Sequence, residues 1–133
     1  YHYFGPYELA KGMSHNQNKA YKADDIVNGI ISFKSGAQFR GCWCFNVAEQ
    51  DKRDQCIIYG SEGSISFSFY GENVSLKSNF KEQVFQFENP QNIQQPMIHA
   101  TVDYFLDKAP NPCSVEEGME VMVLMDCFCM GGN

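Results

Sequence analysis

The segment at residues 49–54 concentrates charged and amide side chains in consecutive positions. It reads Glu-Gln-Asp-Lys-Arg-Asp and follows a predicted strand that contains Trp43 and Phe45. Polar loops at strand ends are common binding sites, because the sheet behind them is rigid. The segment is therefore a candidate binding loop, and a solvated surface loop is the alternative interpretation.

A second candidate is the pair His99 and Asp103, which lie four residues apart in a predicted helix. Residues at this spacing share a helix face, so a histidine base and an orienting carboxylate could meet there. A solvated helix face gives the same pattern, and the sequence places no serine or cysteine nucleophile beside the pair. We assign no catalytic residue in this chain.

Two glycines, Gly60 and Gly63, superficially suggest a phosphate-binding loop. A dinucleotide site requires G-x-G-x-x-G leading into a helix, and a P-loop ends in Gly-Lys-Ser/Thr. A strand pattern follows Gly63 instead, so a hairpin turn is the better interpretation. No cofactor-binding residue is predicted in this chain.

The six cysteines have none of the C-x-x-C spacings of zinc or redox sites. A chain of this length with a full core needs no disulfide. We therefore expect reduced, mostly buried cysteines in a cytoplasmic protein. A predicted helix has acidic residues in its first turns, at Glu116, Glu117 and Glu120, where they interact favourably with the helix dipole. No metal site is predicted.

Charge and hydropathy exclude several classes of partner. The 133 residues carry a net charge of −6, which opposes binding to nucleic acid or to an acidic membrane surface. The longest apolar run, residues 121–125, is far shorter than the roughly 20 residues of a membrane-spanning helix. No nucleic-acid or membrane partner is expected.

The elements that must position these residues divide into strands first and helices last. Strand patterns cover residues 7–16, 26–33, 37–47, 55–59, 64–70, 74–77 and 83–87. In the third of these, Phe39, Gly41, Trp43 and Phe45 alternate with polar residues, so that face is expected to pack on helices. Short connections predict a largely antiparallel meander of about six or seven strands.

The period of the apolar residues changes to that of a helix after residue 93. Pro96 marks a first helical turn, and Ser114-Val115-Glu116-Glu117 is a capping box that opens a second helix to about Met130. That second helix is apolar around much of its girth and is expected to be well buried. The predicted fold is α+β: an open, mostly antiparallel β-sheet with two α-helices packed on one face.

Several segments of the chain carry a family resemblance. They are residues 23–27 (ADDIV), 33–37 (FKSGA), 43–45 (WCF), 57–65 (IIYGSEGSI) and 94–98 (QQPMI), followed by Val102, Pro112, Ser114, Met125 and Asp126. In this order and spacing, across residues 5–128, they resemble the C-terminal domain of the glucose-fructose oxidoreductase/inositol dehydrogenase (Gfo/Idh/MocA) family, in particular its dihydrodiol-dehydrogenase-like members.

The resemblance implies that residues 1–133 form a single C-terminal domain for substrate binding and oligomerisation. It implies a parent enzyme that binds NAD or NADP in an N-terminal Rossmann domain, absent from this chain, and acts on a sugar-like or cyclic polyol substrate. The loop after the strand of Trp43 approaches the substrate in this family, which points to Gln50 and Lys52, with Asn46 and Arg53 behind them. Lys52 or Arg53 would bind a hydroxyl or carboxylate through charge-assisted hydrogen bonds.

The family's Gly-rich turn and its Glu-Lys-Pro motif have no counterpart in this sequence. The fragment is therefore expected to be inactive alone. The sheet face opposite the helices, with Ile30, Cys42 and Cys44, is expected to mediate homo-oligomerisation. A free-standing, non-catalytic dimerisation or ligand-binding module is the alternative, and an autonomous enzyme using His99 and Asp103 is a third hypothesis.

Overall fold

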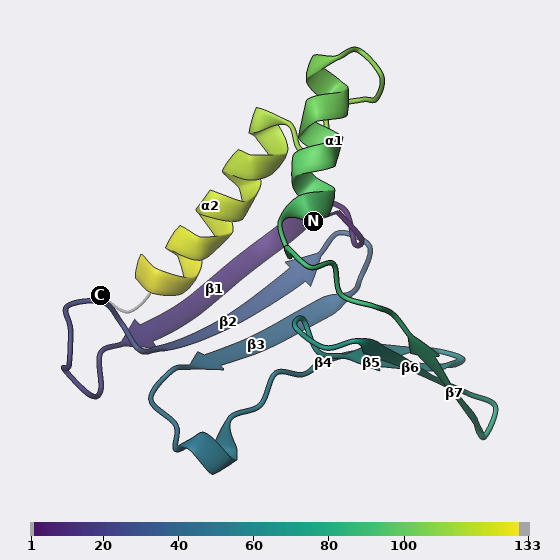
Figure 1. Ribbon diagram of the computed structural model, residues 1–133. Coiled ribbons are helices and arrows are strands. Elements are labelled where there is room, and N and C mark those ends of the chain that lie inside the picture. Colours follow the sequence, from purple (N-terminus) through teal and green to yellow (C-terminus); the bar gives the residue numbers. More distant parts are fainter. Residues whose placement is uncertain (1, 131–133) are drawn as a thin grey trace. The chain divides into compact units, whose positions relative to one another are not determined.

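The computed structural model describes residues 2–130 and shows an open α+β fold with seven strands and two α-helices (Figure 1). The chain divides into two compact units. The first unit comprises Tyr1–Glu49 and Cys113–Asn133, and the second unit comprises Gln50–Pro112. The predicted class and antiparallel pairing are confirmed, but the strands form two sheets, of three and four strands, where one was expected.

The first unit is a three-stranded antiparallel sheet covered by a helix. Strands β1 (Tyr7–His15), β2 (Ile26–Phe33) and β3 (Gln38–Cys44) lie in chain order. Helix α2 (Val115–Met130) runs across β1 and β2 (Figure 1). The apolar face predicted for the third strand is the covered one, because Phe39 packs on the core and the Trp43 ring stacks on Phe128 at 5.9 Å.

Two glycines of a three-glycine row let α2 approach this sheet closely. Gly12, Gly29 and Gly41 are directly opposite one another on β1, β2 and β3. A Cβ atom on Gly29 would lie 2.6 Å from the Phe128 ring, and one on Gly12 would lie 2.6 Å from the Phe128 Cα. Phe128 therefore occupies the space that a side chain at Gly12 or Gly29 would need. It packs with Ile31, Phe33 and Leu124 in the buried core.

Helix α2 begins at the predicted capping box. The Ser114 backbone N–H donates to Glu117 Oε2 at 3.0 Å, and the Glu117 N–H donates to Ser114 Oγ at 3.2 Å. The prediction that this helix is well buried was wrong. Leu124 and Phe128 are buried, whereas Val121, Met122 and Met125 are exposed, because a single sheet face covers one stripe of the helix.

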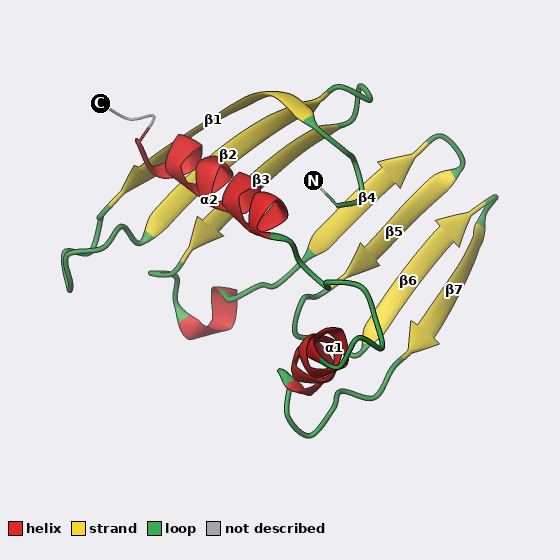
Figure 2. Ribbon diagram, turned by 90° about the horizontal axis from the view of Figure 1, so that it is seen from above, coloured by secondary structure: helices red, strands yellow, loops and turns green. Residues whose placement is uncertain are grey.

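The second unit is a four-stranded antiparallel sheet in which each strand pairs with the next (Figure 2). Its strands are β4 (Cys56–Gly60), β5 (Gly63–Phe67), β6 (Asn73–Ser78) and β7 (Lys81–Gln86). Gly60 pairs with Gly63, which confirms the hairpin predicted there. The sequence indicated a longer break between β6 and β7, whereas a two-residue turn, Asn79-Phe80, joins them directly.

Helix α1 (Gln95–Phe105) belongs to the second unit and has Pro96 in its first turn, as predicted. Within the described part of this unit it packs against none of the strands β4 to β7. The expectation that both helices pack on a sheet therefore holds for α2 and not for α1. Its apolar residues, among them Val102 and Phe105, remain exposed.

Candidate functional site

A depression with many polar side chains lies on one face of β5 and β6 in the second unit. Serines alternate along β5, so Ser66 and Ser68 share that face, and Ser75 on β6 is directly opposite Ser66. The depression is open and has a volume of about 530 Å³. It is lined by Arg53, Asp54, Gln55, Ser66, Phe67, Ser68, Asn73 and Ser75.

Asp54 is held at this depression by two donors from the segment after β5. The Ser68 hydroxyl donates to Asp54 Oδ2, and the Tyr70 backbone N–H donates to the same oxygen at 2.9 Å. The Ser68 hydrogen bond, supported by the Tyr70 N–H, holds the pKa of the Asp54 carboxyl below its usual value. Asp54 therefore presents a fixed anionic acceptor at the depression that Arg53 also lines.

Arg53 is the one predicted site residue that lines the depression. Its guanidinium makes no hydrogen bond or ion pair with the residues that the structure describes, so its donors are available to a ligand. Gln50 lies in the short 3-10 helix Glu49–Asp51, and Lys52 follows it. Both are exposed, and neither lines the depression.

Asn46, the fourth predicted residue, belongs to the first unit and is tied into a hydrogen-bond cluster there. Its Nδ2 donates to Gln17 Oε1 at 3.1 Å, and its Oδ1 accepts from Cys44 Sγ at 2.8 Å. Asn46 thus positions the loop between β1 and β2, a role that its own sequence neighbours did not indicate.

The buried carboxylate of Asp25 fixes the backbone of that same loop. Asp25 is 2% exposed, and its two carboxylate oxygens accept from the backbone N–H groups of Gln17 and Asn18 at 2.8 Å each. The Gln17 N–H, followed by the Asn18 N–H and the Asn46 side chain, lowers the pKa of Asp25. The structure thus shows a buried, hydrogen-bonded carboxylate at this position.

The other candidate residues form no second site within residues 2–130. No hydrogen bond or ion pair joins His99 to Asp103. No disulfide joins the six cysteines, all of which the structure describes, and the expectation that most are buried was wrong: Cys42, Cys113 and Cys129 are exposed. The described residues contain no metal-binding group of three His, Cys, Asp or Glu side chains, and neither α1 nor α2 is long and apolar enough to cross a membrane.

The serines and Asn73 of the depression were missed by sequence reasoning. The alternation of Ser64, Ser66 and Ser68 with Ile65 and Phe67 was visible and indicated only a strand. The signal that was available is serine at three alternate positions, which places three hydroxyls on one face of the strand.

Sequence comparison relates the chain to part of a longer protein. It is 46% identical over 128 residues to "Oxidoreductase P35" of Formosa agariphila, an alignment that covers 96% of this chain and 39% of the relative. The chain thus spans about two-fifths of the length of that relative. No family model matches the sequence.

Comparison of structures finds the same fold in larger oxidoreductases. Biliverdin reductase from Synechocystis, solved with biliverdin and NADP+, has a TM-score of 0.76 at 16% identity, with 95% of this chain and 40% of that chain covered. An oxidoreductase from Agrobacterium radiobacter, solved with NAD+, L-tartaric acid and magnesium, has a TM-score of 0.76 at 13% identity. The match covers 92% of this chain and 40% of that oxidoreductase. A putative oxidoreductase from Klebsiella pneumoniae has a TM-score of 0.72 at 14% identity, and the match covers 93% of this chain and 41% of that protein.

Proposed function

We propose that this chain is the C-terminal substrate-binding and oligomerisation domain of a cytoplasmic NAD(P)-dependent oxidoreductase of the Gfo/Idh/MocA type. The observation that carries the proposal is the 46% identity, over nearly the whole chain, to two-fifths of a protein named as an oxidoreductase. The fold shared with parts of oxidoreductases solved with NADP+ or NAD+ supports it. The substrate we propose is a sugar-like or cyclic polyol.

The chain itself does not fit a dinucleotide. A pyrophosphate site needs a glycine-rich turn that leads into a helix N-terminus. Gly60 and Gly63 pair across the β4–β5 hairpin instead, and a strand follows them. We therefore place the nicotinamide in another part of the parent and derive no chemical step through it from these residues.

The depression beside Arg53 supports a polyol ligand. Adjacent hydroxyl groups of a polyol both donate and accept hydrogen bonds, so they need donors and acceptors side by side. Arg53 supplies charged donors, Asp54 supplies an ionised acceptor, and Ser66 supplies a hydroxyl that can donate or accept. The Ser75 hydroxyl donates to Glu82 and is left as an acceptor. Gln50 and Lys52, on the segment that leads into Arg53, complete the proposed substrate loop.

The uncovered face of the first sheet supports oligomerisation. The positions that alternate with the glycine row point away from α2, and they include Met13 and Ile30, which are 64% and 52% exposed. Leu9 is also exposed on this face. Apolar side chains on an open sheet face favour burial against a second copy of the chain.

Steady-state kinetics of the intact parent test the substrate loop. Arg53→Ala and Lys52→Ala should each raise the KM for the polyol, by roughly tenfold to a hundredfold for a lost charge-assisted hydrogen bond. Lys34→Ala, which removes an exposed charge in the β2–β3 turn, is the matched control and should leave KM unchanged. An unchanged kcat/KM in both loop variants would remove the loop from the site.

Sedimentation tests the oligomer. Ile30→Glu should shift the parent toward monomer because it places a charge in the proposed interface, whereas Tyr21→Glu, at a similarly exposed aromatic in the β1–β2 loop, should not. A parent that is already monomeric at high concentration contradicts the interface.

A further inference from the structure

The turn between β6 and β7 combines two unfavourable features in one residue. Asn79 and Phe80 both have positive φ, at 47° and 63°, which is the geometry of a tight hairpin that normally requires glycine at the second position. Asparagine tolerates this region, but a bulky side chain there is strained. Phe80 is also fully exposed and packs on nothing in its own unit. Strain and exposure together indicate that the ring serves contact with a ligand.

A second aromatic side chain, Tyr59, lines the same cavity as Phe80, and this cavity is distinct from the depression lined by Arg53. Phe80 and Tyr59 both line a cavity of about 540 Å³ at this end of the sheet. Tyr59 is 79% exposed, so its ring is open to solvent beside the cavity. The volume falls within the range of roughly 300–1,000 Å³ that is typical of small-ligand sites. Two aromatic rings at one open cavity provide apolar surface that water leaves readily when a ligand with a matching apolar face enters.

A single row across all four strands supplies the polar groups between the rings. Tyr59 is opposite Ser64, Ser64 is opposite Lys77, and Lys77 is opposite Glu82. Directly opposite residues in an antiparallel sheet share a face. An aromatic ring, a hydroxyl, an ammonium and a carboxylate therefore follow one another in a line on one face of the sheet.

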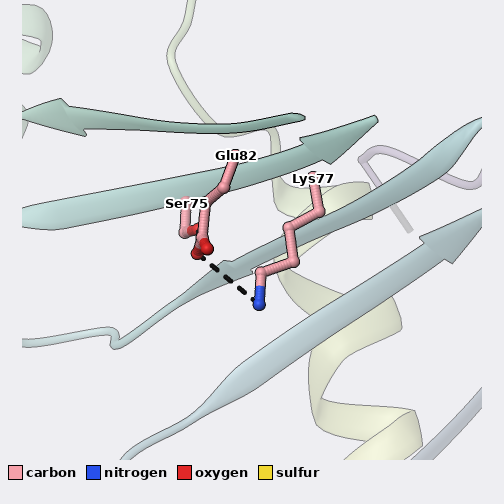
Figure 3. Close-up of polar contacts among 3 residues, drawn as sticks. All are labelled: Ser75, Lys77 and Glu82. Atoms are coloured by element: carbon pink, nitrogen blue, oxygen red, sulfur yellow. Dashed lines mark hydrogen bonds and ion pairs between the residues drawn. The ribbon is translucent and has the colours of Figure 1, made fainter. Parts of the chain in front are cut away.

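Glu82 is fixed within this row by two neighbours (Figure 3). The Ser75 hydroxyl donates to Glu82 Oε1 at 2.7 Å, and Lys77 Nζ lies 3.5 Å from the same oxygen. The Ser75 hydrogen bond holds the pKa of Glu82 below its usual value, so the side chain is an ionised acceptor at neutral pH. The Ser64 hydroxyl makes no hydrogen bond with the described residues and is available to a ligand.

We infer that this cavity is a saccharide-binding site, formed by Tyr59, Ser64, Lys77, Phe80 and Glu82. A sugar ring has C–H faces that stack on aromatic rings and a rim of hydroxyls that donate and accept. Tyr59 and Phe80 contact the C–H faces, while Glu82 accepts from one hydroxyl and Lys77 and Ser64 bond its neighbours. Lys81 also lines the cavity, and Glu82 offsets the charge of Lys77 through their 3.5 Å ion pair.

This inference does not depend on the proposed oxidoreductase activity. A binding site for a saccharide on the second unit stands whether or not the parent transfers a hydride, and its test uses binding alone. Failure of the Arg53 kinetics would remove the substrate loop and leave this cavity unaffected. Failure of the binding test would rule out the saccharide site and leave the proposed substrate loop unaffected.

Saturation-transfer NMR on the intact protein tests the site, with maltotriose, cellotriose, laminaritriose and xylotriose as probes. At least one probe should receive saturation at about 10 mM, the concentration suited to a millimolar Kd. Tyr59→Ala should weaken its binding by roughly tenfold, as expected for the loss of one stacking ring. Tyr70→Ala removes a ring that is 78% exposed and lies outside this cavity, so it is the matched control and should bind as the parent does.

Phe80→Gly keeps the test decisive if Tyr59→Ala fails to fold. This substitution restores the favoured Asn-Gly turn and removes the ring, so the hairpin is retained while binding should fall by a similar factor. The inference is overturned if no probe receives saturation from the parent protein. It is also overturned if the folded Tyr59 or Phe80 variants bind as tightly as the Tyr70 control.

Discussion

Replacement of Phe80 by glycine should stabilise the second unit, although it removes a large apolar side chain. Phe80 has a φ of 63°, a conformation that costs an L-residue about 1–2 kcal/mol. Its ring is fully exposed, so truncation loses no burial. Glycine costs about 0.5–1 kcal/mol through the greater freedom of the unfolded chain. The difference leaves about 0–1.5 kcal/mol of added stability, with a midpoint near 0.75 kcal/mol.

Urea denaturation monitored by circular dichroism measures this change, and a thermal scan should show an increase in Tm of a few degrees. Tyr70→Gly is the control: it also removes an exposed ring, but Tyr70 is not among the residues with positive φ, so glycine there should destabilise by about 0.5–1 kcal/mol. Equal destabilisation by the two substitutions would refute the claim that Phe80 is strained.

Three further substitutions test the first unit by denaturation. Gly29→Ala should destabilise by about 1–3 kcal/mol, because the new methyl overlaps the Phe128 ring, and an unchanged Tm would contradict that packing. Ser114→Ala should cost about 1 kcal/mol through loss of the α2 cap, whereas Ser35→Ala, in an exposed turn, should cost less. Asp25→Asn should lower the stability at neutral pH. Because folding lowers the pKa of Asp25, its contribution is present above the unfolded value of about 3.9 and is lost as the pH falls through the folded value. The difference from the parent should therefore shrink in acid, and a difference independent of pH would contradict this assignment.

The order and type of the elements could be predicted because local patterns determine them. The alternation around Trp43 predicted both the strand and the face that the helix covers, and Ser114 and Glu117 fixed the start of α2 through neighbours three residues apart. The Asn79-Phe80 turn was missed because phenylalanine lacks the glycine signature of a tight hairpin. Sequence alone therefore identifies unstrained turns better than strained ones.

The candidate site was predicted in part. Arg53 was indicated by its position after a strand, but the serines that line the same depression come from β5, the residue that follows it and β6, and their placement depends on pairing between separate strands. The role of Asn46 was missed because its partner Gln17 lies 29 residues away in the chain. The role of Asp25 was missed because it depends on the folded shape of the β1–β2 loop, in which the N–H groups of Gln17 and Asn18 point at its carboxylate. Lys77 and Glu82 meet only because a two-residue turn sets the register of β6 and β7.

Titration with NADH and NADPH, followed by nucleotide fluorescence, tests the central proposal most directly. If this chain is one domain of a larger NAD(P)-dependent oxidoreductase, the intact parent should bind one of the two nucleotides saturably with a Kd on the order of micromolar. Residues 1–133 alone should show no saturable binding. Micromolar binding by residues 1–133, or no binding of either nucleotide by the intact parent, would contradict the proposal.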